Sequence, residues 1–530
     1  MFIPSLILVP IIFGIILYKI PLKFGKYVLL GVQGYLLCLA VFLFFQIEPS
    51  EYVYTILGGD NPILNIVLRG DRMSMLMVVV TNLLFGLGFI YKITDSFFDG
   101  KIMLLYLILQ GLTSGIFLTD DLFNLFILFE VSTVVATLLL MFKKKARVVY
   151  DALYYLITQM VSMMFFLFGI GFLYRTFGVL SVTFIANHIT CIPAGELILP
   201  FAFMMTGLCF KLALFPMYSW ISRAYSLNSA PITQIAVMSS IIMKTSLYWV
   251  IRFHEVFLPA FDFTLFFVIV AVLTALSGAM EAVLQKDIRL ILAYSTVSQI
   301  GFMMFAFFLG EAYNREIVVF HMFNHAVFKM ILFLAAGLLI RNYATADIYE
   351  IRGKIKGNPF IAIVSIIGML AITGFPLTSG SISKYFMSSA LSHLWQEILF
   401  WVMSFGTILI FVRYSTMFLP GQVEKFKFRS NKKLALSVLV GLSLVVGIFA
   451  SYGMNFILQV SKHINFATFV QKGLIYVILV GVATVIYMKF LYRKKFWDKR
   501  LENSLSFSRM CLVLVAFFTL MIVYGLWMVV

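Results

Sequence analysis

Long apolar runs, separated by short polar segments, extend along the whole chain. A helix needs about 20 mostly apolar residues to cross the hydrocarbon core of a bilayer, and most of these runs have about that length. They lack the two-residue alternation of a membrane β-barrel, so the elements that they predict are helices. The pattern indicates an all-α polytopic membrane protein with 14–16 transmembrane helices. The sixteen candidate runs are residues 3–18, 27–46, 73–92, 101–119, 122–142, 151–175, 198–219, 230–251, 264–284, 290–309, 316–340, 360–391, 398–419, 434–457, 470–490 and 509–529.

The composition narrows the class of protein further. Of the 530 residues, 62% are hydrophobic and only 12% are charged, whereas a typical soluble domain is about 25% charged. So few polar side chains cannot cover the water-facing surfaces of several soluble domains. An ordinary soluble enzyme, a disordered chain and a disulfide-rich scaffold are therefore excluded.

The net charge of +17 is explained by the positions of the basic residues in the predicted topology. They gather in the short loops after the odd-numbered runs, such as the loop with Lys143, Lys144, Lys145 and Arg147, and these loops hold 26 of the 40 lysines and arginines. Because such loops stay in the cytoplasm, we expect a multi-pass protein of the cell membrane with its N-terminus outside. This distribution favours a topological role for the charge, and no nucleic-acid partner is expected.

Neither end-processing nor cysteine chemistry is predicted. The first apolar run lacks a preceding positive segment, so it is interpreted as a retained span and not as a cleaved signal peptide. The four cysteines show no CxxC or Cys/His spacing, which gives no support for a disulfide framework, zinc or an Fe–S cluster. They are Cys38, Cys191, Cys209 and Cys511.

Five ionisable residues lie inside different predicted spans: Glu130, Lys211, Lys244, Lys329 and Lys384. Each charge at the bilayer centre costs roughly 2.5–3.5 kcal/mol on insertion scales. A lone lysine of this kind can snorkel or simply join two helices, but five such residues in different helices indicate a function. We interpret them as a chain of proton-exchanging groups, in which protonation of one group biases its neighbour through the low-dielectric interior.

Two histidines extend this series along one helix. His321 and His325 precede Lys329 at steps of four residues, which places all three on one helix face, about 6 Å apart per turn. Two histidines at this spacing can also bind zinc, but no carboxylate or cysteine lies at ligand spacing beside them. We favour the interpretation that these three titratable side chains line a buried path that contains water, and no metal site is predicted.

Two of the predicted spans contain residues that break a helix. The breaking residues are Pro216 in the span 198–219, and Gly374, Pro376 and Gly380 in the span 360–391. Proline removes a backbone donor and glycine weakens the helix, so neither span is expected to be a continuous helix. In membranes such breaks persist where the backbone lines a cavity, and they are typical of ion sites near the midplane.

Five blocks of the sequence, in a consistent order between about residues 70 and 390, resemble a known family. The chain is similar to the antiporter-like proton-channel subunits shared by Mrp-type cation/proton antiporters, respiratory complex I and membrane-bound hydrogenases. The blocks are DLFNLFILFEV with Glu130, GLCFKLALFPMYSWISRAYSLNSAPITQIAVMSSIIMKTSLYWVIRF with Lys211 and Lys244, QKDIRLILAYSTVSQIGFM, HMFNHAVFKMILFLAAGLL with His321, His325 and Lys329, and GFPLTSGSISKYF with Lys384.

At two aromatic positions the chain resembles the D subunit of the Mrp antiporters more than the other members of the family. Tyr218 and Tyr225 stand where members from complex I and hydrogenases usually have histidine. Two features depart from the family pattern: the usual WLP reads Trp220-Ile221-Ser222, and the C-terminal region carries about two extra spans. The interpretation of the chain as a divergent relative inside another complex therefore stays open.

The resemblance implies a pair of inverted five-helix repeats, each containing a broken helix. It divides the chain into N-terminal transmembrane helices over residues 1–100, a first repeat over 101–253, a second repeat over 264–419 and C-terminal transmembrane helices over 434–530.

The resemblance also implies roles for the buried residues. Glu130 and Lys211 would form a coupled pair, and Lys384 would guard the exit to the far side. Lys244 and the face of His321, His325 and Lys329 would form the central relay. No cofactor is expected, because the antiporter-like subunits of the family bind none.

The leading functional hypothesis is a proton-translocating subunit of a multisubunit monovalent cation (Na⁺)/proton antiporter. Its expected partners are other membrane subunits, protons, Na⁺ or K⁺, and lipid. One alternative is a proton- or sodium-pumping membrane-arm subunit of a complex I-like or hydrogenase complex, in which the chain would be a non-catalytic part of an oxidoreductase. A self-sufficient solute transporter is a third alternative.

Overall fold

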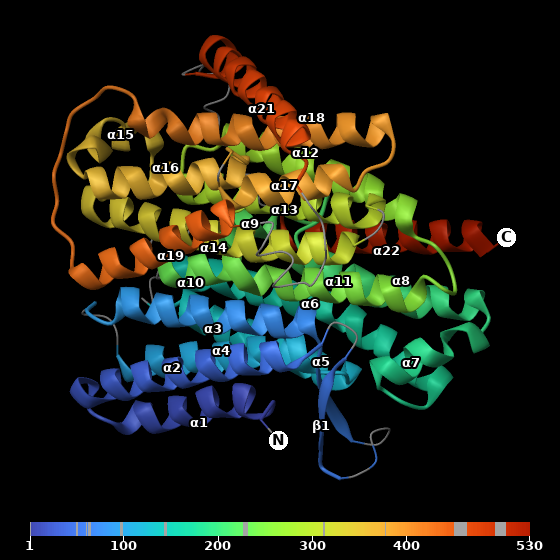
Figure 1. Ribbon diagram of the computed structural model, residues 1–530. Coiled ribbons are helices and arrows are strands. Elements are labelled where there is room, and N and C mark those ends of the chain that lie inside the picture. Colours follow the sequence, from blue (N-terminus) through green and yellow to red (C-terminus); the bar gives the residue numbers. More distant parts are fainter. Residues whose placement is uncertain are drawn as a thin grey trace. The chain divides into compact units, whose positions relative to one another are not determined.

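The computed structural model describes residues 2–48, 51–59, 61, 65–95, 99–142, 146–225, 232–310, 313–376, 378–449, 464–492 and 505–529. Most of these residues are helical (Figure 1). The basic cluster Lys143–Lys145 and the last part of the predicted span 434–457 lie outside the described residues.

Fourteen of the described helices are long and apolar enough to cross a membrane, which confirms the predicted all-α polytopic class. Two of the sixteen predicted spans take a different form. The run at 3–18 gives a short helix of 15 residues, α1 (Ser5–Lys19). The run at 360–391 gives two shorter helices, α16 (Pro359–Thr373) and α17 (Ser379–Ser389).

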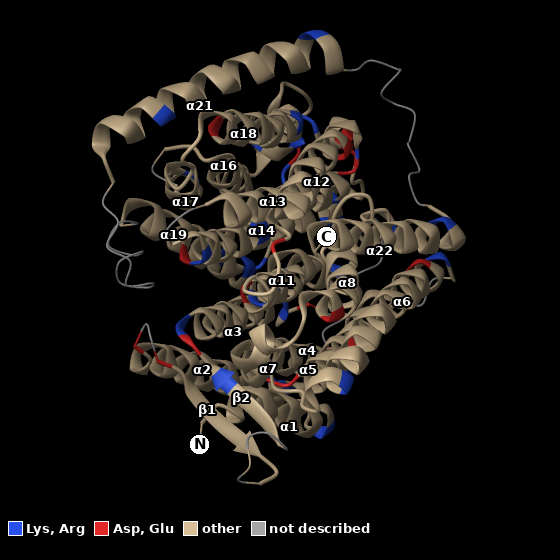
Figure 2. Cartoon of the chain, turned by 90° about the vertical axis from the view of Figure 1, so that its right-hand side faces the viewer, with Lys and Arg blue, Asp and Glu red and all other residues tan. Residues whose placement is uncertain are grey.

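The chain divides by its internal packing into two compact units. Unit 1 comprises Met1–Gln234, Ile241–Phe266 and Leu505–Val530. Unit 2 comprises Ile235–Ser240 and Phe267–Ser504. Lys, Arg, Asp and Glu occupy few positions in either unit, so most of the ribbon in Figure 2 is tan.

Unit 1 is built mainly from helices that pack along their lengths. Within it α1 packs on α4, α6 on α8, and α8 on both α11 and α22. Helix α10 (Ile232–Val237) continues through a π-helical turn (Met238–Ile242) into α11, and this composite span is 94% buried. Its residues Ile235–Ser240 are counted with unit 2. The other helices of unit 1 are α2 (Leu22–Gln46), α3 (Arg72–Lys92), α4 (Gly100–Leu118), α5 (Leu122–Leu140), α6 (Ala146–Phe177), α7 (Val182–His188), α8 (Ala194–Lys211), α9 (Trp220–Tyr225), α11 (Met243–Phe257) and α22 (Phe507–Val529), with a 3₁₀ turn at Ile189–Cys191.

Aspartate residues start three consecutive helices of unit 1. The side chains of Asp71, Asp99 and Asp121 each accept a hydrogen bond from the backbone N–H three residues further on, at the first turns of α3, α4 and α5. A carboxylate at this position satisfies a backbone donor that the helix itself leaves unpaired. These caps explain why each helix begins where the apolar run begins.

A β-hairpin lies where only a loop is predicted. Strands β1 (Val53–Leu57) and β2 (Ile66–Gly70) pair antiparallel. The backbone N–H of Asp120 donates to the carbonyl of Val67, so β2 also holds the segment that leads into α5. The hairpin therefore lies at the end of unit 1 where α3 and α5 begin (Figure 1).

Helix α14 is the centre of unit 2. It packs against α13, α16, α17 and α19, and 94% of its apolar stretch is buried, whereas the corresponding value for α21 is 17%. Polar residues within this apolar stretch of α14 are therefore enclosed by protein. The remaining elements are α12 (Thr264–Leu284, whose first three residues belong to unit 1), α13 (Ile288–Leu309), α14 (Asn314–Tyr343), α15 (Ile348–Ile351), α18 (Leu394–Tyr414), α19 (Ser430–Ile448) and α21 (Phe466–Ile486), with 3₁₀ turns at Lys354–Gly357 and Ser415–Phe418 and a π-helical turn at Tyr487–Leu491.

Candidate functional site

Lys211 is the last residue of α8, and the chain leaves the helix directly after it. Ala213 has a φ of 56°, which is a left-handed conformation of the kind that ends helices. Helix α9 starts only at Trp220, so Pro216 lies in the irregular stretch between two helices. The break therefore begins at Lys211 itself, ahead of the proline from which it is predicted.

Lys211 lies beside Glu130 of α5. Its Nζ donates to Thr133 Oγ1 at 2.7 Å and lies 5.4 Å from the centre of the Phe129 ring. The ammonium and the Glu130 carboxylate interact electrostatically, and Oε1 of Glu130 is buried without a hydrogen bond from the described residues. Thr133 thus fixes the cation on α5, and Glu130 keeps an oxygen that can take up a proton. The sequence prediction omits Thr133, although its spacing of three residues from Glu130 places both on one helix face.

A glycine allows α8 to approach α6 closely. A Cβ on Gly207 would lie 2.8 Å from the carbonyl oxygen of Ser162 in α6, a distance that side-chain carbons do not tolerate. Small residues at helix–helix contacts are the usual means of close packing in membranes. Gly207 precedes Lys211 by about one turn, so this contact sets the position of the lysine.

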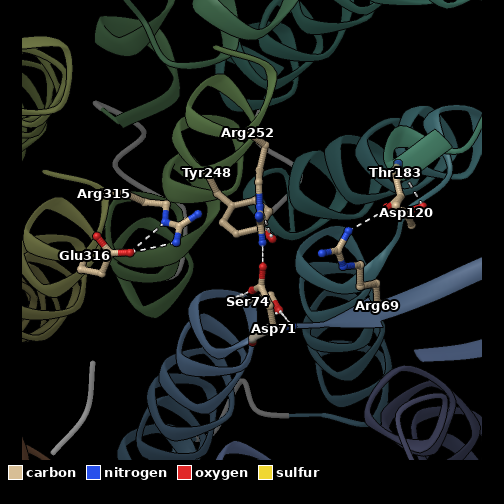
Figure 3. A network of polar contacts seen from close by, with 9 residues as sticks. All are labelled: Arg69, Asp71, Ser74, Asp120, Thr183, Tyr248, Arg252, Arg315 and Glu316. Atoms are coloured by element: carbon tan, nitrogen blue, oxygen red, sulfur yellow. Dashed lines mark hydrogen bonds and ion pairs between the residues drawn. The ribbon is translucent and has the colours of Figure 1, made fainter. Parts of the chain in front are cut away.

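Lys244 begins a ladder of side chains on α11. The lysine is fully buried, and Tyr248 and Arg252 follow it at steps of four residues on the same face. Arg252 Nε donates to Tyr248 Oη at 3.1 Å, and its guanidinium pairs with Asp71, the N-cap of α3 (Figure 3). The ladder leads from a buried ammonium to an ion pair that is about one-fifth exposed. The sequence prediction contains Lys244 and omits Tyr248 and Arg252, which the same four-residue spacing would have found.

A second polar cluster fastens the hairpin to the neighbouring helices. Arg69 of β2 donates to Thr183 Oγ1 at 2.7 Å, and Thr183 donates in turn to Asp120 at 2.7 Å (Figure 3). Ser181 donates to the other oxygen of Asp120 at 2.8 Å. Because these bonds join β2, α7 and the start of α5, we assign this cluster a structural role.

In unit 2, His321, His325 and Lys329 are fully buried on α14. The ring centres of the two histidines are 6.4 Å apart, which is the spacing of one helical turn. Lys329 Nζ donates to the backbone carbonyl of Leu292 at 2.7 Å and to Ser295 Oγ at 2.5 Å, both on α13. Its cation is therefore held by the oxygens of a carbonyl and a hydroxyl.

Both ring nitrogens of His321 make hydrogen bonds. Nε2 lies 3.2 Å from Gln299 Oε1, and Nδ1 lies 2.8 Å from Ser383 Oγ. The amide nitrogen of Gln299 donates to Thr407 at 2.9 Å, so the amide oxygen is the group that faces His321. An amide oxygen only accepts, and Nε2 therefore carries a proton whether the imidazole is neutral or charged.

Ser383 accommodates both charge states of His321. When the imidazole is neutral, Nδ1 accepts a hydrogen bond from the hydroxyl of Ser383. When it is protonated, Nδ1 donates instead, and the hydroxyl turns to the carbonyl of Gly380, 3.2 Å away. His321 can thus gain and lose a proton at the cost of one hydroxyl rotation. Neither Gln299 nor Ser383 is predicted as a site residue, although both stand as polar residues within the apolar blocks that resemble the family.

Lys384 lies on α17, directly after the second helix break. Gly374 has a φ of 91° and ends α16, and Pro376 lies between the two helices. Lys384 Nζ donates to the carbonyl of Thr373 at 3.2 Å, a group that the end of α16 leaves unpaired. The break therefore supplies a ligand for the lysine.

Gly380, in the first turn of α17, allows the two halves of the broken helix to pack together. A Cβ at this position would overlap the carbonyl oxygen of Ala371 in α16, so any side chain would clash with backbone. Asn324 of α14 donates to the carbonyl of Ser379 at 3.2 Å and holds the start of α17 from the other side. The break is thus a packed part of unit 2.

Within the described part of the chain, no three or more His, Cys, Asp or Glu side chains come together in a way that could hold a metal ion. The structure surrounds Lys211, Lys329 and Lys384 with hydroxyl and carbonyl oxygens. Each of these oxygens accepts a hydrogen bond from the lysine ammonium group.

The fold and these buried groups define a polytopic membrane subunit of the antiporter-like class. Residues 119–412 match the family model described as NADH:quinone oxidoreductase/Mrp antiporter, TM. This segment is more than half of the chain and contains all seven residues predicted to exchange protons. The chain belongs to this family, which confirms the resemblance seen in the sequence.

Relatives of the chain are found in antiporters and in respiratory complexes. The D subunit of the Na⁺/H⁺ antiporter of Alkalihalophilus pseudofirmus is 25% identical over 397 residues, which cover 72% of this chain and 79% of that protein. A chain of the Mrp complex from Dietzia sp. DQ12-45-1b has the same fold, with a TM-score of 0.80, 19% identity and coverage of 89% of this chain and 99% of that chain. A chain of the membrane-bound sulfane sulfur reductase, an archaeal respiratory membrane complex, gives a TM-score of 0.80, 23% identity and coverage of 91% and 99%.

Proposed function

We propose that this chain is the proton-translocating membrane subunit of a multisubunit monovalent cation/proton antiporter, with Na⁺ as the exchanged cation. The observation that carries the proposal is the set of buried ionisable groups inside the matched segment, above all Lys329 and Lys384, which backbone carbonyls hold. A lysine held in this way can lose its proton without leaving a carboxylate unpaired in the low-dielectric interior. The similarity to the D subunit of an antiporter supports the same function.

In the proposed mechanism each unit contributes one set of proton-exchanging groups. In unit 1, uptake of a proton by Glu130 removes its negative charge and weakens its attraction for Lys211. In unit 2, protons move along the face of His321, His325 and Lys329, with the hydroxyl of Ser383 turning as His321 changes charge. Lys384, at the helix break, exchanges protons with the far side of the membrane.

The proposed setting is the cell membrane, with the N-terminus outside and the other subunits of the complex as partners. Lipid is the proposed partner of the apolar side chains that α21 and α22 expose, such as Leu474 at 61% and Leu512 at 68%.

The membrane arm of a redox-driven complex is the second candidate, because the family model covers NADH:quinone oxidoreductase subunits as well. Purification of the intact complex in mild detergent distinguishes the two candidates. Small membrane subunits alone would support the antiporter, whereas Fe–S or nickel-hydrogenase subunits would support the redox complex.

The exchange activity itself provides the direct test. We expect Glu130→Ala and Lys211→Ala to abolish Na⁺/H⁺ exchange in vesicles that contain the whole complex, because each removes half of the buried pair. Lys23→Ala, which changes an exposed lysine in the first turn of α2, is the control and should leave exchange unchanged. Wild-type exchange in either test variant would contradict the proposed relay.

A further inference from the structure

Unit 2 contains a cavity beside Lys384. The volume open to the centres of water molecules is about 40 Å³. One water molecule needs only about 10–15 Å³ of volume measured in the same way. Its walls come from α16, α17, α18 and α21, and they include the hydroxyls of Ser388, Tyr385 and Tyr476. Most of the wall is apolar, and these hydroxyl-bearing residues and Lys384 are among the polar groups that can hold a small number of water molecules.

A second lysine, Lys472 of α21, lines the same cavity. Its Nζ donates to Ser388 Oγ at 2.5 Å and to Ser389 Oγ at 3.0 Å, and it lies 5.1 Å from the centre of the Tyr385 ring. These contacts hold the ammonium at a fixed place in the wall. Lys472 lies beyond residue 412, outside the segment that matches the family model, and it is not among the predicted site residues.

The charged residues that line the cavity have one sign. Among the described residues that line it there are two lysines, Lys384 and Lys472, and no Asp or Glu. The carboxylate of Glu397 on α18 acts on Lys472 electrostatically but does not line the cavity. A metal cation that entered would face two ammonium groups in a low-dielectric setting, without the anionic oxygen ligands that such cations prefer.

We propose that Lys472 makes this cavity a filter, which admits water and protons to Lys384 and excludes metal cations. The field of Lys472 opposes a proton and a metal cation alike, as fixed positive charge does in water channels. A proton is compensated because it forms an N–H bond with the amine of Lys384, whereas a metal cation finds no anionic oxygen ligand in the cavity. The role of the filter rests on the proposed function of Lys384. Lys472 itself does not exchange protons and acts only through the electric field of its ammonium group. If the complex exchanges Na⁺, the sodium ion takes a route other than this cavity.

A thiol reporter in the cavity tests the filter directly. Gly473 lines the cavity next to Lys472, and a Cβ there would lie 3.6 Å from Pro376 Cγ, which is an ordinary contact. In the intact complex, with the four native cysteines of this chain changed to serine, Gly473→Cys is treated with anionic and cationic methanethiosulfonate reagents of similar size. We expect the anionic reagent to react faster, and Lys472→Met to lower the ratio of the two rates about tenfold.

Two further variants separate the charge of Lys472 from its packing. Lys472→Arg keeps the cation and should keep the ratio of rates. Lys489→Met removes an exposed lysine in the π-helical turn that continues α21, and it should also leave the ratio unchanged. An unchanged ratio in Lys472→Met would overturn the filter, and a cysteine at position 473 that reacts with neither reagent would overturn a water-accessible cavity.

Transport measurements keep this inference apart from the proposed function. If the wild-type complex shows no exchange, the proposed function fails, whereas the ratio of thiol reaction rates still decides whether the filter exists. If exchange is present, we expect Lys472→Met to slow it, because metal cations that enter the cavity then hinder proton transfer to Lys384, and we expect Lys472→Arg to keep the wild-type rate. Equal rates in Lys472→Met and the wild type would overturn a role for the filter in exchange.

Discussion

At the scale of single residues, His321 is the group whose chemistry the structure defines most completely. Its two hydrogen-bond partners lie on other helices, and one of them, Ser383, can both donate and accept. We expect Ser383→Ala to slow exchange by about tenfold or more, because a hydrogen bond to a charged group contributes roughly 1.5–3 kcal/mol. Exchange rates in vesicles that contain the whole complex provide the measurement.

The control for this prediction removes a hydroxyl that does not contact His321. Ser277→Ala deletes a hydroxyl that donates to the carbonyl of Thr274 in its own helix, and its exchange rate should match the wild type. Ser383→Thr retains a hydroxyl and should be less impaired than Ser383→Ala. Equal rates for Ser383→Ala and the wild type would show that His321 does not need this partner.

At the scale of helices, close packing places the ends of broken helices against their partners. In α8 this depends on Gly207, which lies against the backbone of α6. We expect Gly207→Ala to destabilise the protein by about 1–3 kcal/mol, because the added Cβ forces α6 and α8 apart. Thermal denaturation of the purified complex in detergent measures this loss, and exchange should fall as well because Lys211 moves.

A glycine of α6 provides the matched control. A Cβ on Gly171 would have no atom within 4 Å, so Gly171→Ala should be neutral or slightly stabilising. If both variants denature at the wild-type temperature, then the close approach of α6 and α8 does not contribute to stability.

At the scale of the whole molecule, the distribution of basic loops predicts the orientation in the membrane. Lys23, between the first two predicted spans, should face the cytoplasm, and Glu48, after the second, should face outside. Both side chains are exposed. In a cysteine-free chain, we expect Glu48→Cys to react with a membrane-impermeant thiol reagent in intact cells, and Lys23→Cys to react only after the cells are permeabilised. The reverse pattern would contradict the proposed topology.

The sequence by itself determined the class of protein, nearly all of the spans and the residues with unusual chemistry. Apolar runs of this length have no stable place except a membrane, and ionisable groups within them stand out because burying a charge is costly. The shared face of His321, His325 and Lys329 also follows from helix geometry alone. These features are local, so each can be read from a short stretch of sequence.

Only the tertiary structure decided which groups surround each buried charge. Thr133 and Lys211 are 78 residues apart, His321 and Ser383 are 62 apart, and Lys472 and Ser388 are 84 apart. The pairing of β1 with β2 and the end of α8 at Lys211 were likewise not predictable from local pattern. Such contacts depend on how helices distant in the sequence pack against one another, and the apolar pattern that makes each helix is the same for many different neighbours.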